Sequence, residues 1–560
     1  MTSSEPGPEV VDLVVVGAGM GGLATAVTAA DAGLTTVLLE AGEKVGGAAA
    51  YSGVQVWVGA NHVGRERGIE DSLEDALAYV RWAARQDLAS LDEDRTREWL
   101  SGAAEAAEYF ERTGVITWDL VPDYPDYYYP DAPGAAVTGR YLTSSPYDGR
   151  LLGDDLDLLL VSPHFPVGIT YGEMFAWGGM SSRTEWDLDL VARRRAQHVL
   201  TFGTGIVAPF FRAVLERGVP VLLQHRVASV ARQGDLLAVT ATTPAGTWTV
   251  LARDVVVATG AHDWSEELMV ELTGITPENG GTVVPPSVRG DARDLLAGLG
   301  ATIATLPAWA APVLPGYRLS EPSFPGDTGY RACFEHCLPH TVIVDAEGRR
   351  FADDSFHPAI VRGVLATDPP RFPVFLVWDS QHHAKYGLGA TPPGGDYPEG
   401  LVCRADSLEE LGQLLGIDGG TLRGTVEGYN AGAAEGEDPE LGRGSNLSVR
   451  RFRGDGNQRP NPCVGPLDRP PFFGMRLRLL STGIAASGVV AGRAGRLLDR
   501  DGAEVPGVHV VGEASARAAA GVGYNSGYSL SRAMAYGYLA VRDICSRRTE
   551  SGILTTMTPR

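Results

Sequence analysis

Apolar residues near the start of the chain fall into two short runs, separated by a glycine turn and an alanine-rich stretch. From Glu9 to Glu40 the sequence reads EVVDLVVVGAGMGGLATAVTAADAGLTTVLLE. The first run is rich in β-branched residues, as strands are, and the alanine-rich stretch has a helical pattern. This order of strand, turn, helix and strand predicts a βαβ unit.

A similar pattern returns later in the chain. Residues 219–260 alternate short strands with turns and end on a buried-type strand, and residues 505–544 again read as strand, turn and helix. Residues 283–470 instead show a mixed α+β pattern with proline-rich connectors. We therefore expect an α/β fold in which a Rossmann-like nucleotide-binding domain, residues 1–282 and 471–560, contains an inserted α+β domain, residues 283–470.

Composition and charge narrow the class of partner. Hydrophobic residues make up 44% and charged residues 21% of the 560 residues, which is typical of a globular protein. The net charge of −22 would repel phosphate backbones and anionic lipids, so we expect no nucleic-acid partner. No window holds the ~18 consecutive apolar residues of a membrane span. Five cysteines form no disulfide framework and no export signal is visible, which predicts a cytoplasmic location.

The strongest motif is the glycine turn between the first strand and the helix. Gly17 permits the tight turn, Gly19 lets the backbone approach a pyrophosphate, and Gly22 lets helix and strand pack closely. The helix N-terminus offers free N–H groups and a positive dipole to the phosphates. Glu40, at the end of the next strand, is placed to accept hydrogen bonds from a ribose hydroxyl. These residues predict a dinucleotide site.

Two further segments favour FAD over NAD. Residues 46–53, GGAAAYSG, form a second glycine-rich loop directly after the ribose acid, where a longer cofactor would continue. Near the C-terminus, VPGVHVVGEAS at 505–515 predicts a strand that ends on Gly512 and Glu513, suited to hold the ribitol. A helix from about Ser529 would direct its N-terminal amides at the flavin pyrimidine.

Together with these segments, SPYDGRLLG (145–153), GTGIVAPFFRAVLERGVPVLL (203–223) and RRFADDS (349–355) resemble the succinate dehydrogenase/fumarate reductase flavoprotein superfamily. The tyrosine-rich segment YPDYYYPDAPG (124–134) is most similar to the 3-ketosteroid dehydrogenase branch. The resemblance implies an FAD-binding domain of the glutathione-reductase type with an inserted catalytic domain. It implies FAD contacts at Gly17, Gly19, Gly22, Glu40, Gly47, Ser52, Gly53, Val227, Ala258, Thr259, Gly260, Gly512, Glu513, Ser529 and Leu530.

Some members of the superfamily attach FAD covalently through a histidine in the second glycine loop. This chain has only alanines there, so we expect noncovalent FAD. The arginines and histidines with which related enzymes hold dicarboxylates are also replaced, by Leu480, by Tyr524 and by the segment Phe356-His357-Pro358. Too few fixed cations remain for a succinate-like dianion, which disfavours fumarate or succinate chemistry.

A tyrosine in place of an arginine suits a ketone. The resemblance implies that Tyr524 hydrogen-bonds the ketone oxygen, stabilises the enolate and so assists proton loss, while hydride leaves the adjacent carbon for the flavin. An assisting tyrosine is expected from the cluster Tyr124, Tyr127, Tyr128 and Tyr129, and we select Tyr128. The base tyrosine expected after RRFADDS is missing, and His357 is the titratable candidate there.

Structural alternatives remain open for these side chains. The tyrosines can simply pack a loop against the inserted domain, His357 can pack or line the pocket, and Tyr528 can either face the pocket or pack. Cys333, His336, Cys337 and His340 carry four possible zinc ligands, but such crowding is atypical of zinc sites, so we expect a core-facing stretch and no metal.

The function predicted is hydride transfer between flavin N5 and a carbon near a ketone of an apolar polycyclic substrate, that is, a desaturation. One alternative is an enone reductase that runs the reverse reaction with the same residues. Another is a non-catalytic FAD-binding protein that has lost its base. Because no CxxCH haem motif is present, the electron acceptor or donor must be external.

Overall fold

The structure, a computed structural model, describes residues 10–163, 168–323 and 327–550. Its first sheet joins both ends of the described chain. β1 (Val10–Val16) pairs in parallel with β2 (Thr36–Leu39) and with β11 (Gly246–Val257), and β11 pairs in parallel with β22 (Glu504–Val510). The C-terminal strand thus returns to the N-terminal βαβ unit, as the sequence predicts.

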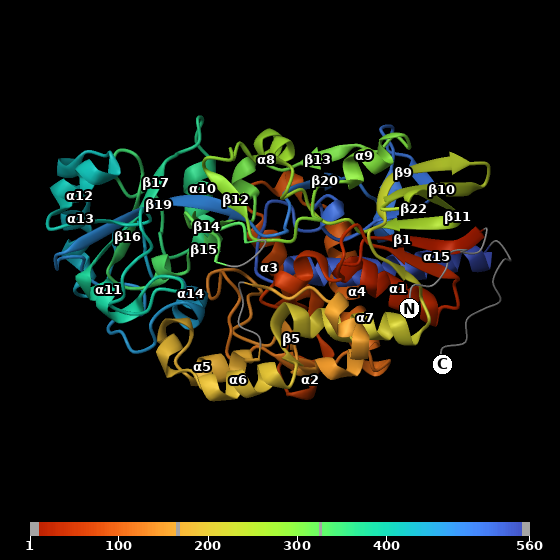
Figure 1. Cartoon of the computed structure of the whole chain (residues 1–560), viewed down its shortest axis with the longest axis horizontal. Coiled ribbons are helices and arrows are strands. Elements are labelled where there is room, and N and C mark those ends of the chain that lie inside the picture. Colours follow the sequence, from red (N-terminus) through yellow and green to blue (C-terminus); the bar gives the residue numbers. More distant parts are fainter. Residues whose placement is uncertain (1–9, 164–167, 324–326, 551–560) are drawn as a thin grey trace.

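Eight strands form this sheet, in the order β21-β22-β11-β1-β2-β8, with β10 and β9 extending from β11. The bounds not yet given are β8 (Val221–Leu222), β9 (Arg226–Gln233), β10 (Leu236–Thr243) and β21 (Arg496–Leu498). Below the sheet in Figure 1 lie four helices, α1 (Met20–Asp31), α4 (Glu93–Arg112), α7 (Phe202–Glu216) and α15 (Tyr528–Glu550). The helices α1 and α15 pack so closely that a Cβ on Gly537 would lie 2.6 Å from the Gly21 carbonyl oxygen.

A second sheet forms the lobe at the left of Figure 1. Its order is β15-β14-β19-β17-β16, with β12 and β18 also paired to β19. Its strands are β12 (Gly280–Thr282), β14 (Leu314–Arg318), β15 (Tyr330–Ala332), β16 (Thr341–Val344), β17 (Val374–Asp379), β18 (Cys403–Ala405) and β19 (Phe472–Ser481). Because β12 and β19 lie just outside residues 283–470, strand pairing extends this sheet slightly beyond the predicted insertion, whose boundaries stay a prediction.

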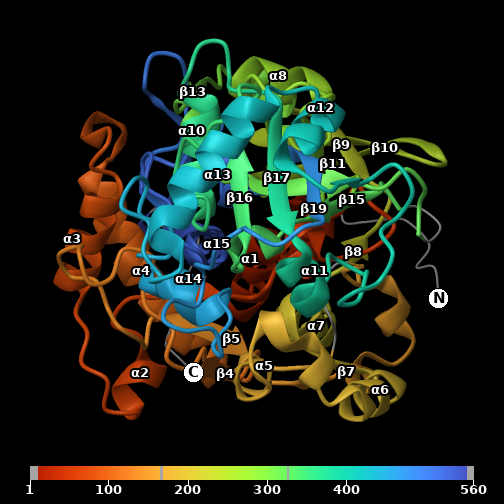
Figure 2. The same ribbon diagram turned by 90° about the vertical axis from the view of Figure 1, so that its left-hand side faces the viewer.

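The fold class is confirmed: a mixed α/β molecule with a largely parallel nucleotide-binding sheet and a second α+β lobe. Helices cover the second lobe: α8 (Glu266–Thr273), α10 (His357–Leu365), α11 (Ser380–Tyr386), α12 (Leu408–Leu415), α13 (Gly419–Ala433) and α14 (Leu447–Phe452). The helix α9 (Ala292–Ala297) instead packs on the first sheet beside β9 (Figure 1). In both views α12 and α13 lie on its outer side, and α14 lies on the side that faces the tyrosine-rich region (Figures 1 and 2).

Residues 56–163 and 168–200 lie largely along the lower side of the molecule in Figures 1 and 2. The small sheet β3-β5-β4 organises it. Its elements are β3 (Val56–Trp57), α2 (His62–Glu66), α3 (Leu73–Ala83), β4 (Trp118–Leu120), β5 (Tyr141–Ser144), β6 (Tyr147–Asp148), α5 (Tyr171–Ala176), α6 (Leu188–Ala196) and β7 (Val199–Leu200). Elsewhere β13 (Ile303–Thr305) pairs with β20 (Ser487–Val489).

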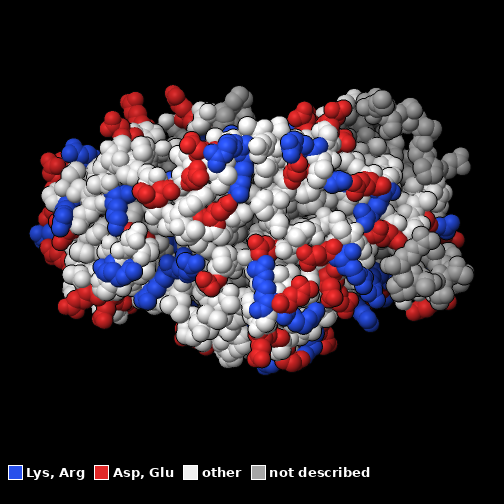
Figure 3. Space-filling view, turned by 90° about the horizontal axis from the view of Figure 1, so that it is seen from below, with Lys and Arg blue, Asp and Glu red and all other residues white. Residues whose placement is uncertain are grey.

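Acidic and basic side chains are interspersed across the lower face of the molecule (Figure 3). That face therefore does not present the concentrated positive charge typical of nucleic-acid binding. Among the described residues, no helix combines the length and the apolar character needed to cross a bilayer.

Candidate active site

The glycines of the first turn leave room only for backbone. Gly17 has φ +103°, and a Cβ there would lie 2.5 Å from the Ala258 carbonyl oxygen. A Cβ on Gly22 would lie 1.8 Å from the Gly17 carbonyl oxygen, so the turn and α1 can touch only without a side chain. Gly19 differs, because the nearest atom to its Cβ position is 4.0 Å away. The open side of the turn is therefore at Gly19, directly before the first amides of α1.

Glu40 closes the end of β2 beside this turn. Its side chain is 5% exposed, and it accepts hydrogen bonds from the Ala18 amide at 2.8 Å and the Gly42 amide at 2.7 Å. Burial raises the pKa of this carboxyl, while the two amides oppose the rise. Each carboxylate oxygen still has a free lone pair with which it can accept a ribose hydroxyl.

Gly17, Gly19 and Glu40 line one crevice. Eight of the predicted cofactor residues border it: Gly17, Gly19, Glu40, Gly47, Val227, Ala258, Thr259 and Gly260. The sequence reading missed several other lining residues, namely Ala41, Ala48, His225, Ser287, Val288, Asp291 and Leu295. Ser287 to Leu295 reach the crevice from the segment predicted as the insertion, so no local pattern could have assigned them to the cofactor.

The second glycine loop lies against the first turn. The Gly46 amide donates to the Ala18 carbonyl at 3.0 Å, and a Cβ on Gly47 would lie 3.3 Å from the Gly19 Cα. Further along this loop, the Ser52 hydroxyl donates to the Ala49 carbonyl at 2.7 Å, and the Gly53 carbonyl accepts from the Tyr171 hydroxyl at 2.5 Å. Ser52 and Gly53 therefore continue the loop beyond the crevice, and their cofactor contacts stay a prediction.

The C-terminal segment reaches the same region. Gly512 has φ +64° and packs against Ala533 of α15. Glu513 accepts from the Ala485 amide at 3.0 Å and lies 3.3 Å from Arg532, so its carboxylate is held in place. Ser529 and Leu530 occupy the first turn of α15, as the predicted helix from about residue 529 requires.

The crevice fits a dinucleotide by two tests. The N-terminus of α1 carries no side-chain cap, so its amides are available to a phosphate. The Thr259 hydroxyl is buried at the crevice wall without a hydrogen-bond partner, as expected of a group that a polar ligand satisfies. Residues of the two glycine loops, of Val227 to Gly260 and of Ser287 to Leu295 would hold FAD here, with Gly19 and α1 at the pyrophosphate.

Three aromatic side chains from distant segments converge between the lobes. The ring centroids of Tyr127 and His357 lie 5.9 Å apart, those of Tyr127 and Tyr524 lie 6.1 Å apart, and those of His357 and Tyr524 lie 5.9 Å apart. Tyr127 comes from the loop between β4 and β5, His357 opens α10, and Tyr524 precedes α15. The structure thus brings together two of the three predicted catalytic residues.

Tyr128, the tyrosine selected from the sequence, lies beside this cluster. Its ring contacts Tyr79, Trp82 and Phe356, and the Arg85 guanidinium lies 5.5 Å above it. Burial raises the pKa of Tyr128 to about 12. These contacts favour Tyr127 over Tyr128 as the assisting group, although the role of either phenol stays a proposal.

One buried amide holds the two tyrosine segments together. Asn525, which follows Tyr524, accepts from the Tyr127 amide at 3.1 Å and from the Tyr79 hydroxyl at 2.6 Å, and it donates to the Tyr141 hydroxyl at 2.9 Å. Its side chain is fully buried. Tyr127 and Tyr524 are therefore fixed relative to each other before any ligand binds.

Tyr528 packs in the core. Its ring centroid lies 5.0 Å from that of Trp57 and 4.9 Å from that of Trp99, and its hydroxyl is buried without a hydrogen-bond partner. These contacts favour the packing alternative for this residue.

The titratable groups of the cluster are held in their neutral forms. Burial, reinforced by the charges of Arg453 and His336, holds the pKa of His357 well below its ordinary value. Burial raises the pKa values of Tyr524 and Tyr127 above theirs. The Nε2 atom of His357 is buried without a hydrogen-bond partner. The cluster therefore offers a neutral imidazole as proton acceptor and phenols as hydrogen-bond donors.

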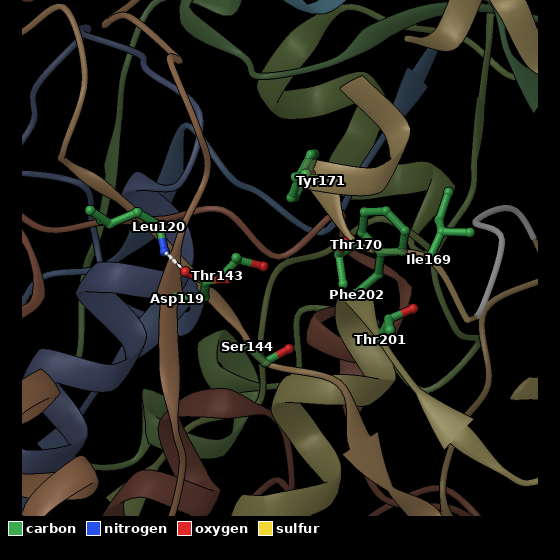
Figure 4. Close-up of a pocket in the computed structure, with 10 residues that line it drawn as sticks. Asp119, Leu120, Thr143, Ser144, Ile169, Thr170, Tyr171, Thr201 and Phe202 are labelled. Atoms are coloured by element: carbon green, nitrogen blue, oxygen red, sulfur yellow. Dashed lines mark hydrogen bonds between the residues drawn. The ribbon is translucent and has the colours of Figure 1, made fainter. Parts of the chain in front are cut away.

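A second, smaller pocket is shown in Figure 4. It is lined by Asp119, Leu120, Thr143, Ser144, Ile169, Thr170, Tyr171, Gly172, Thr201 and Phe202. It shares no lining residue with the crevice. We assign it no part in the site.

The zinc-like segment is buried in the second lobe. The Cys337 thiol donates to the Ser355 carbonyl, and the rings of His336 and His340 hydrogen-bond the carbonyls of Asp354 and Pro466. Within residues 10–163, 168–323 and 327–550, no group of three or more His, Cys, Asp and Glu is placed to hold a metal.

Comparison with known proteins agrees with this geometry. The family model described as FAD binding domain matches residues 12–530. The chain is 32% identical to 4-oxocyclohexanecarboxylate 2-dehydrogenase of Sinomonas cyclohexanicum, over 96% of this chain and 93% of that one. It is 27% identical to 3-oxosteroid 1-dehydrogenase of Mycolicibacterium smegmatis, over 96% and 98%.

Among solved structures, the chain resembles the crystal structure of 3-ketosteroid delta1-dehydrogenase from Sterolibacterium denitrificans in complex with 1,4-androstadiene-3,17-dione. The TM-score is 0.85 and the identity 26%, over 96% of this chain and 100% of that chain. The resemblance to the 3-ketosteroid dehydrogenase branch is confirmed, and the match to the family model identifies the bound cofactor as FAD.

Proposed function

Because this chain belongs to the FAD-binding domain family, we propose that it is an FAD-dependent dehydrogenase that introduces a double bond beside the ketone of an apolar ring. The observation that carries the proposal is the convergence of the rings of Tyr127, His357 and Tyr524, together with the buried Nε2 atom of His357, which has no hydrogen-bond partner. Relatives named as dehydrogenases of 3-oxosteroids and of 4-oxocyclohexanecarboxylate support it.

The roles follow from the protonation states. Tyr524, kept as a phenol by its raised pKa, donates a hydrogen bond to the ketone oxygen and stabilises the negative charge that develops there. Neutral His357 accepts the proton from the carbon next to the ketone at Nε2. Tyr127, in contact with both rings, assists this transfer; Tyr128, the choice made from the sequence, is the alternative. FAD, held beside Gly19 and the N-terminus of α1, would supply the acceptor for the hydride of the neighbouring carbon, so that proton and hydride together account for the two hydrogens lost by the ring.

Three finer points belong to the proposal. FAD is held noncovalently, since residues 48–50 of the second glycine loop are alanines. The electrons leave to an external acceptor. The five cysteines are free thiols, which supports the cytoplasmic location expected from the sequence.

The decisive experiment is anaerobic reduction of the bound FAD by a ketone. We expect the yellow absorbance to bleach when a cyclic ketone, either 4-oxocyclohexanecarboxylate or a 3-oxosteroid, is added to the purified holoprotein. The His357→Gln variant should slow bleaching by about 10²-fold or more if the imidazole takes the proton. His383→Gln, which changes a histidine in α11, is the matched control and should bleach normally.

Two other outcomes would replace this proposal. Holoprotein that no ketone bleaches, but that an enone reoxidises after dithionite reduction, would be a reductase working in the reverse direction. FAD that responds to neither ketone nor enone would indicate a non-catalytic FAD-binding protein.

A further inference from the structure

Two arginines of the second lobe, ten residues apart, differ in how their charge is balanced. Arg443 is fully buried, pairs with Asp354 at 2.7 Å and donates to the carbonyls of His336, Leu338 and Cys463. Asp354 and Asp438 also pair with Arg350, so two cations meet two anions. The charges of this group are therefore balanced by residues of the protein itself.

Arg453 has no such partner. Among the described residues, no aspartate or glutamate forms an ion pair with it. Its guanidinium lies 4.5 Å from the Phe334 ring centroid and 5.9 Å from that of Phe452. It also hydrogen-bonds the Cys337 thiol, which carries no charge at neutral pH because burial raises the pKa of that thiol to about 11. The two aromatic rings attract the guanidinium but do not neutralise its charge, so Arg453 can still form an ion pair with an anion.

Arg453 lies beside the catalytic cluster. It follows α14, whose N-cap residue Asn446 donates to the Tyr127 carbonyl at 2.6 Å and so fixes the helix against the tyrosine loop. The ring of Phe452, the residue before it, packs against Tyr124 of the tyrosine-rich segment, with centroids 5.2 Å apart. The charge of Arg453 also contributes to the pKa shifts of His357, Tyr127 and Tyr524, the three members of the cluster. The helix α14 is labelled in Figures 1 and 2. An anion bound to Arg453 would therefore lie near the cluster.

We propose that the substrate is a cyclic ketone that also carries a carboxylate, and that Arg453 is the residue that binds this carboxylate and so determines specificity. This inference rests on the proposed dehydrogenation and names its substrate class. It departs from the sequence-based expectation of a wholly apolar substrate, because the sequence alone could not show that Arg453 lacks an acidic partner. A guanidinium binds a carboxylate through two parallel hydrogen bonds, which also orients the ring.

The test compares 4-oxocyclohexanecarboxylate with its methyl ester, which keeps the ring and the ketone but removes the charge. Wild-type holoprotein should reduce its FAD with the acid at a kcat/KM about 10²-fold higher than with the ester. Arg453→Gln should lose that factor, so that the ratio of its rates with acid and ester falls to about one. Because the charge of Arg453 also acts on the cluster, the readout is this ratio within each variant, and FAD content shows that the variant is folded. Arg453→Lys, which keeps a charge, should recover part of the preference.

Arg451→Gln is the matched control. Arg451 lies two residues away, 4.0 Å from the exposed Asp123 and over the Phe175 ring, so the variant loses the same charge outside the cluster. It should retain the preference for the acid. Equal rates for acid and ester in the wild type, or loss of the preference in Arg451→Gln as well, would overturn the assignment of Arg453.

Binding of cyclohexanecarboxylate, which has no ketone, separates this inference from the proposed function. Calorimetry should show binding to wild-type holoprotein and at least about tenfold weaker binding to Arg453→Gln. If neither ketone bleaches the flavin but this difference persists, the proposed dehydrogenation fails while the anion site stands. If a 3-oxosteroid bleaches the flavin but the carboxylate neither binds nor reacts, the dehydrogenation stands and the inference fails.

Discussion

In the cofactor crevice the glycine turn offers backbone groups to a ligand beside the side chains of Glu40 and Thr259, whereas the cluster of Tyr127, His357 and Tyr524 consists of side chains. Gly17 and Gly22 admit no Cβ, and the groups offered to a ligand there are amides and carbonyls. In the cluster, three aromatic rings from three segments contact one another edge to face. The difference teaches that binding of the cofactor depends on local chain geometry, while the choice of reaction depends on which side chains the tertiary structure brings together.

Gly22→Val should have the largest effect on FAD binding and activity, because it displaces the glycine turn that borders the crevice. A Cβ would meet the Gly17 carbonyl oxygen at 1.8 Å, so the turn must move. We expect retention of FAD to weaken by roughly 10²-fold or more, with loss of all activity. FAD content after gel filtration measures this. Gly428→Ala, at an exposed helical glycine with open space around it, should retain FAD fully. A yellow, active Gly22→Val protein would contradict this description of the crevice.

Tyr524→Phe should have the second-largest effect, and it changes only the cluster of Tyr127, His357 and Tyr524. Removing the phenol should lower turnover by about 10²-fold, because the ketone oxygen loses its hydrogen-bond donor, with FAD content unchanged. Turnover per bound flavin is the measurement. Tyr528→Phe is the control, since that hydroxyl is buried without a partner and its removal should be nearly neutral. If both variants behaved alike, Tyr524 would have no special role.

A smaller effect should distinguish the two neighbouring tyrosines. Tyr127 contacts both His357 and Tyr524, whereas Tyr128 packs on Trp82 and Phe356. We expect Tyr127→Phe to slow FAD reduction by about tenfold and Tyr128→Phe to slow it less than twofold. Rapid-mixing measurements of flavin bleaching give both rates. The reverse order would restore Tyr128, the residue selected from the sequence, as the assisting group.

The smallest expected effect is on the pH profile. Burial lowers the pKa of His357 and raises that of Tyr524, so the imidazole stays neutral and the phenol protonated throughout the neutral range. As pH falls, kcat/KM should therefore remain level through ~6.5, the ordinary pKa of histidine, and decrease only well below it. An acid limb centred near ~6.5 would show that His357 is more solvated than the structure places it.

The same comparison explains which features of the fold and of the site could be predicted from the sequence. The glycine turn, Glu40 and the return of the C-terminal strand were predictable because each is a local pattern with a defined spacing. Choosing between Tyr127 and Tyr128 was not, because adjacent residues point in different directions. What orients Tyr127 is hydrogen bonding of its backbone to Asn446 and Asn525, 319 and 398 residues away. Arg453 was missed for the same reason. The sequence contains many arginines, and only the fold shows which of them has no acidic partner among the described residues.

Asn525 has a consequence for how such enzymes diverge. It ties Tyr524 to the tyrosine loop through one amide, while Arg453 stands on a different element, directly after α14. If Arg453 binds the carboxylate of the substrate, an exchange at this one position would change which substrate is bound and leave the hydrogen bonds of Asn525 in place. An exchange of Asn525 itself would instead remove the hydrogen bonds that join the segment of Tyr524 to the loop of Tyr127, and so would disturb both catalytic tyrosines together.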